Sequence, residues 1–155
     1  MLKKVLLGLM VPASIAGMST LQAAENNCMP IGGLGTANLV AEKDGTYTIA
    51  AKMVGSVSNA AGKVTKIRKT ATGLELDMEH YFMTAKGGFM LTRDIGVLTA
   101  VPGKKDHYMT EITYKIQEGS TSGVLKGYKG TFKSWGLTDL GKPQVVVRYA
   151  GEICK

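Results

Sequence analysis

Hydrophobic and polar residues alternate with a period of two in several stretches of the chain, which is the pattern of half-buried β-strands. In the clearest stretch, residues 74–82, leucine, methionine and phenylalanine share one face, while three acidic residues share the other. Strands are predicted at residues 46–54, 64–68, 74–82, 88–92, 97–101, 108–116, 130–135 and 145–154. About eight short strands therefore follow one another along the chain.

Turn-forming residues separate these strands, as at Asp44-Gly45, Gly87-Gly88 and Pro102-Gly103. No helical pattern occurs after the first two dozen residues. The 20 glycines argue against a coiled coil, and a hydrophobic content of 45% argues against a disordered chain. The sequence therefore predicts an all-β fold with a single antiparallel sandwich or barrel of about eight strands.

The first 24 residues have the three parts of a secretory signal. Lys3 and Lys4 form the positive start, an apolar stretch covers residues 5–11, and small residues lead to Gln22-Ala23-Ala24. We expect cleavage after Ala23 or Ala24, which leaves residues 25–155 as a barrel domain in the periplasm or the extracellular medium. The apolar stretch is shorter than the about 20 residues that a membrane-spanning helix needs, so no membrane span is predicted.

The chain has two cysteines, Cys28 and Cys154, at opposite ends of the predicted domain. In an exported protein, two cysteines most simply form one disulfide. Two thiolates are too few for a metal site, and only two histidines are present to complete one, so no metal is predicted. A disulfide brings the first and last strands together, which favours a closed barrel over an open sandwich.

Residues 110–154 carry a strand, a glycine-rich turn and a strand. Gly123, Gly127 and Gly130 occupy the turn, and a final strand runs through residues 145–153. This pattern resembles the allene oxide cyclase and dirigent barrels, and most of all their uncharacterised secreted bacterial relatives. The resemblance implies a dirigent- or lipocalin-like barrel whose copies associate as a homo-oligomer. It also implies a cyclase- or isomerase-like activity that constrains a reactive intermediate. No cofactor is predicted.

Six residues are candidates to line an interior cavity. His80 interrupts an apolar strand face, where an imidazole could exchange a proton near neutral pH. The three aromatic candidates could pack around a small ligand and form part of the cavity wall. Two charged residues share one face of the last strand, and this face is either inside the barrel, where the charges must pair, or simply the outer surface. The six are His80, Phe82, Tyr114, Trp135, Arg148 and Glu152.

The formal net charge of +7 raises the question of a polyanionic partner. The basic residues are scattered and lack interleaved aromatics, so no nucleic-acid site is predicted. Anionic surfaces of the cell envelope are the more plausible electrostatic partners of an exported protein. The acidic face at residues 75–79 is expected to oppose the basic strand at residues 63–69, as cross-strand charge pairs do.

Three functional readings follow, and no catalytic motif decides between them. The first is a barrel that binds a small, mostly apolar molecule without chemistry. The second is the cyclase- or isomerase-like enzyme, with His80, Arg148 and Glu152 as the residues to examine. The third is an interaction module with a filled interior. An apolar cavity favours the first reading, a cavity with ionisable groups favours the second, and a packed interior favours the third.

Overall fold

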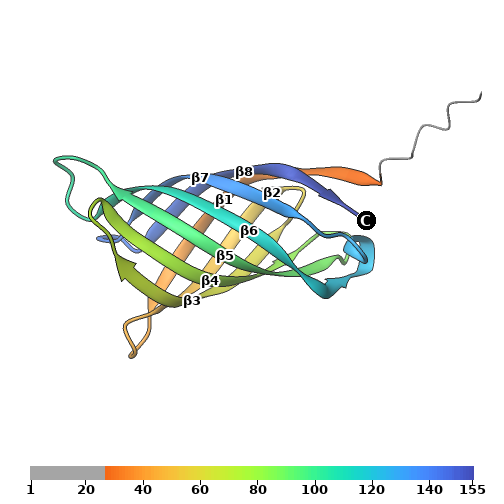
Figure 1. Cartoon of the computed structure of the whole chain (residues 1–155), viewed down its shortest axis with the longest axis horizontal. Coiled ribbons are helices and arrows are strands. Elements are labelled where there is room, and N and C mark those ends of the chain that lie inside the picture. Colours follow the sequence, from red (N-terminus) through yellow and green to blue (C-terminus); the bar gives the residue numbers. More distant parts are fainter. Residues whose placement is uncertain (1–26) are drawn as a thin grey trace, which may run out of the picture.

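The computed structural model describes residues 27–155 and shows a closed barrel of eight antiparallel strands in sequence order (Figure 1). A single 3₁₀ turn, η1 (Gly123–Leu125), lies between the sixth and seventh strands. No helix in this range is long and apolar enough to cross a membrane. The strands are β1 (Cys28–Ala41), β2 (Tyr47–Gly55), β3 (Asn59–Lys69), β4 (Gly73–Met83), β5 (Phe89–Ala100), β6 (His107–Ser122), β7 (Thr131–Asp139) and β8 (Gln144–Cys154). The predicted all-β class and eight-stranded barrel are confirmed; the predicted signal at residues 1–24 and its cleavage lie outside the described residues.

Two details of the strand prediction differ from the structure. Strand β1 was not predicted, because glycines at 32, 33 and 35 replace the apolar residues that would have revealed alternation. The two segments predicted at 88–92 and 97–101 form one strand, β5. Ile95 points outward and Asp94 inward at its centre, which inverts the expected polarity and hides the continuity of the strand.

The barrel closes through eleven paired positions between β1 and β8, from Cys28 opposite Cys154 to Asn38 opposite Gln144. The two cysteines form a disulfide at the start of this ladder, with a sequence separation of 126 residues. The predicted disulfide and the predicted adjacency of the first and last strands are therefore both present. Closure leaves neither strand with an unpaired edge.

The two ends of the barrel differ. The turn at residues 56–58 and η1 lie at the end that carries the disulfide. Buried side chains from the strands, from this turn and from η1 fill that end. These include Ile31, Val57, Met90, Leu125 and Ile153, each at most 2% exposed. At the opposite end the loops 42–46, 70–72, 101–106 and 140–143 leave the inward-facing side chains only half-buried. The first end is plugged, and the second is the accessible one.

The outer face of β3 and β4 carries the predicted pairing of basic and acidic residues. Arg68 Nη2 lies 2.7 Å from Glu75 Oε1, and Arg68 Nη1 lies 2.6 Å from Asp77 Oδ2. The hydrogen bond from Arg68 to Asp77 lowers the pKa of the Asp77 carboxyl below its usual value of 3.8. The acidic row is therefore a solvated, charge-paired surface rather than a site that needs a ligand.

Replacing Arg68 with Gln is expected to return the pKa of Asp77 toward its ordinary range. In the wild type, the lowered pKa contributes stability above about pH 4 that is lost as the pH falls through the folded-state pKa. The variant should lack this contribution and lose slightly less stability on acidification. Carboxyl ¹³C titration by NMR measures the shift, and Lys69→Gln on the same strand is the control. An unchanged Asp77 titration in Arg68→Gln would show that the pairing does not persist in solution.

Candidate ligand cavity

A cavity of about 80 Å³ lies inside the barrel. Most of the side chains that line it are apolar. At the accessible end it is lined by Leu39, Tyr47, Leu74 and Leu140, which are half-buried. Ala51, Met53 and Met78 also line it. The lining also includes His80, the one imidazole in the wall. The barrel thus holds a slender apolar space with a single ionisable imidazole.

Glycines on neighbouring strands make room for the large side chains of this wall. A Cβ atom at Gly62 would lie 2.6 Å from His80 Cδ2 and 2.7 Å from the backbone oxygen of Glu79. A Cβ at Gly96 would lie 2.7 Å from Met78 Cε. All three distances are too short for a real Cβ contact, so a side chain at either position would displace its neighbour. The imidazole keeps its place in the cavity wall because residue 62 has no side chain.

His80 forms a buried pair with Asp94 of the neighbouring strand. Nδ1 of His80 lies 2.7 Å from Oδ2 of Asp94, and the two residues are 5% and 4% exposed. Burial raises the pKa of the Asp94 carboxyl, and the hydrogen bond to His80 opposes this shift. The other oxygen, Oδ1, has no hydrogen-bond partner in the described part of the chain. A carboxyl in such surroundings is costly unless its charge is shared or neutralised.

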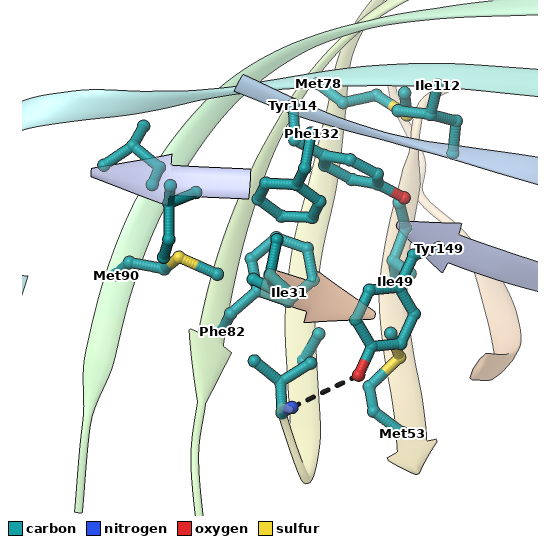
Figure 2. Packing of buried hydrophobic residues seen from close by; sticks show 14 of the residues in the cluster. Ile31, Ile49, Met53, Met78, Phe82, Met90, Ile112, Tyr114, Phe132 and Tyr149 are labelled. Carbon is teal, nitrogen blue, oxygen red and sulfur yellow. Dashed lines mark hydrogen bonds between the residues drawn. The ribbon is translucent and has the colours of Figure 1, made fainter. Parts of the chain in front are cut away.

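Phe82, Tyr114 and Phe132 form an aromatic cluster inside the barrel (Figure 2). The rings of Phe82 and Tyr114 lie beside His80, with centroids 5.7 and 5.5 Å from that of the imidazole. Tyr114 stacks on Phe132 with 4.7 Å between ring centroids, and both rings meet the edge or face of Phe82 at 5.3–5.4 Å. The hydroxyl of Tyr114 lies 3.0 Å from Ser134 Oγ, and burial raises the pKa of this tyrosine. Phe82 and Tyr114 of this cluster also line the cavity.

A second buried tyrosine fixes the plugged end. The amide of Val57 donates a hydrogen bond of 3.2 Å to the hydroxyl of Tyr149, drawn as a dashed line in Figure 2. The ring lies over β1 and β2, where a Cβ at Gly33 would come within 2.7 Å of the hydroxyl oxygen. Tyr149 thereby ties the turn at 56–58 to β8 and holds the plug in place.

The structure brings three of the six candidate residues together inside the barrel. His80, Phe82 and Tyr114 all line the cavity. Trp135, Arg148 and Glu152 lie on the outer surface, with Trp135 45% exposed, so they cannot contribute to an interior site. The prediction left the orientation of β8 open because apolar residues occur on both its faces. Tyr149 and Ile153 take the inside, which turns the two charged residues outward.

Asp94 is the site residue that the sequence prediction missed. Its signal is its place in the alternation of β5, where Met90, Thr92 and Leu98 are all buried. A carboxylate at an inward position needs a partner, and the histidine at an inward position of β4 is the available one. Reading the two strands as neighbours would have joined His80 to Asp94.

Comparisons of the chain with protein-family models, with curated proteins and with solved structures found no match. The resemblance to allene oxide cyclase and dirigent barrels therefore stays a prediction. Cys28, Cys154 and Glu152 lie within 4.8 Å of one another, but the two sulfurs are joined in the disulfide and offer no thiolate to a metal. The function is therefore inferred from the geometry of the cavity.

Proposed function

We propose that this protein is an exported barrel that binds a slender apolar molecule in its interior. The observation that carries the proposal is the apolar cavity, which is plugged at the disulfide end and bordered by half-buried side chains at the other. Proteins rarely keep such a space in a packed interior, because each missing contact costs stability. The disulfide supports export, since such bonds persist in oxidising compartments.

The size of the cavity limits its ligand. An apolar cavity of about 150 Å³ can bind benzene. The space here is about 80 Å³, so it suits an unbranched chain or a small group whose remainder extends through the accessible end. An apolar wall also holds water poorly, so an apolar ligand that enters the cavity displaces few well-bound water molecules.

A cyclase- or isomerase-like activity is the second candidate function, and the buried His80–Asp94 pair is the observation that favours it. The wall offers few other polar groups to assist chemistry. Thr110 and Thr138 hydrogen-bond to each other at 2.7 Å, and Tyr114 is engaged with Ser134. A catalyst of this kind would need further groups at positions where charge develops. Binding is therefore the function that the geometry supports best.

Replacing Ala51 with Phe is expected to weaken ligand binding strongly, because the new ring would occupy space in the cavity that Ala51 lines. Ala50→Phe is the matched control, since Ala50 is exposed on the opposite face of the same strand. Hexane is the probe, and ¹³C-methyl methionine signals report its entry. Met53 and Met78 line the cavity, whereas Met83 and Met109 are exposed and serve as internal references.

Hexane should shift the signals of Met53 and Met78 in the wild type and in Ala50→Phe. In Ala51→Phe the affinity should fall at least about tenfold, as expected when a pocket is filled. Failure of hexane to shift either methionine in the wild type would overturn the proposal and favour the filled interaction module. Equal binding by the two variants would place the hexane outside the barrel.

A further inference from the structure

The two nitrogens of the His80 ring have different surroundings. Nδ1 is held by Asp94 at 2.7 Å, whereas Nε2 makes no hydrogen bond to any residue of the described range. The Cδ2–Nε2 edge of the ring lies over Gly62, in the wall of the cavity. Asp94 thus fixes the orientation of the ring and leaves Nε2 for a group inside the cavity.

The number of protons on the His80–Asp94 pair decides whether Nε2 is a hydrogen-bond donor or acceptor. A pair that holds two protons is neutral, with one proton between Nδ1 and Oδ2 and the other on Nε2. A pair with one proton is anionic, and burial among apolar side chains disfavours an uncompensated charge. Burial also raises the pKa of Asp94. Burial therefore favours the neutral pair, in which Nε2 carries a hydrogen.

The neighbouring strands supply no cation that would stabilise the anionic form. Strand β3 places Gly62 opposite His80, and β5 places Thr92 there. Strand β6 places Tyr114 opposite Asp94, and burial raises the pKa of this tyrosine, so it remains a neutral phenol. Phe82 and Met78, the inward neighbours on β4, are apolar. Within residues 27–155, the pair is surrounded by neutral groups.

We propose that the cavity binds an apolar molecule that carries one neutral hydrogen-bond acceptor, such as a ketone or ester carbonyl, and that His80 Nε2–H donates a hydrogen bond to this oxygen. This inference rests on the proposed function and specifies its ligand class. A carboxylate ligand would add a buried negative charge beside Asp94 and is disfavoured. An ammonium group offers only hydrogens, which Nε2–H cannot accept.

Two probes of equal chain length, hexane and 2-hexanone, separate the two proposals. Methyl signals of Met53 and Met78 report occupancy of the cavity, and imidazole ¹⁵N signals report the hydrogen bond. The chain has only two histidines, and the exposed His107 is an internal reference. Both probes should shift the methionine signals. Only 2-hexanone should change the ¹⁵N chemical shift of His80 Nε2. With either probe, this chemical shift should stay in the range of a protonated nitrogen.

A variant without the pair provides the second measurement. His80→Leu combined with Asp94→Val removes both polar partners, so no orphaned charge is left behind. Relative to its affinity for hexane, its affinity for 2-hexanone should fall by about 2- to 10-fold, the equivalent of one net hydrogen bond. If this variant does not fold, the ¹⁵N measurement on the wild type still decides the question.

The outcomes are distinct. Methionine shifts with both probes and an Nε2 shift with 2-hexanone alone would support the inference. Methionine shifts with both probes but no response of His80 to 2-hexanone would overturn the inference and leave the proposed function standing. An Nε2 signal of an unprotonated nitrogen would also overturn it. No methionine shift with either probe would overturn the proposed function itself.

Discussion

Replacing Cys28 and Cys154 together with serine is expected to lower the free energy of unfolding by about 5 kcal/mol. The disulfide closes a sequence separation of 126 residues, almost the whole described chain, and so restricts the unfolded ensemble strongly. In the native state it also clamps the first pair of the β1–β8 ladder, where the barrel closes. For a domain of this size the midpoint of thermal unfolding should fall by about 15 °C.

Urea and thermal denaturation of the oxidised wild type and the double-serine variant measure this effect. The wild type in the presence of a thiol reductant is the control, because it loses the bond without a change of residue. The reduced wild type and the variant should unfold at similar urea concentrations, both well below the oxidised protein. Coincident transitions for oxidised and reduced protein would show that closure of the barrel does not depend on this bond.

Replacing His80 with Leu is expected to lower the free energy of unfolding by about 3 kcal/mol, the second-largest effect. The substitution leaves the Asp94 carboxyl buried, with Oδ2 as well as Oδ1 lacking a partner. Adding Asp94→Val should restore most of the loss, since an apolar pair of similar size leaves no orphaned polar group. A single variant as stable as the wild type would contradict the buried pair.

The pH dependence of the single variant follows from the same carboxyl. Burial raises the folded-state pKa of Asp94 above its usual value of 3.8. A raised carboxyl pKa contributes stability that is fully present below about pH 4 and is lost as the pH rises through the folded-state value. The stability difference between His80→Leu and the double variant should therefore be small in acid and grow toward neutral pH. Urea midpoints measured across this range test the sign.

Much of this fold is predictable from the alternation of apolar and polar residues, because one face of each strand is buried and the other is exposed to solvent. Residues 74–82 show this best, and β4 has the predicted inside and outside faces. Alternation does not reveal the glycine-rich β1. Neighbouring side chains lie so close to this strand that glycine stands where an apolar residue would otherwise mark it. At Gly35, for example, a Cβ would lie 2.6 Å from Met53 Sδ, a contact that depends on strand pairing and not on local sequence.

The candidate site was predictable only in part, for a related reason. His80, Phe82 and Tyr114 sit on strands whose polar residues mark the outer face. Arg148 sits on a strand with apolar residues on both faces, so its orientation depends on which side chains fit the interior. Tyr149 points inward there, and its hydroxyl accepts a hydrogen bond from the Val57 amide of a turn that is distant in sequence. The partnership of His80 with Asp94 likewise depends on the register between β4 and β5.

Native mass spectrometry of the protein, recovered without detergent from the cells that produce it, is the decisive test for a ligand in the barrel. We expect the mass of the disulfide-bonded chain plus one small molecule, which is released on denaturation and is absent from Ala51→Phe. The identity of that mass would also show whether it carries a neutral carbonyl. A wild-type mass equal to that of the chain alone would contradict the proposed binding function and indicate a barrel that works without a ligand.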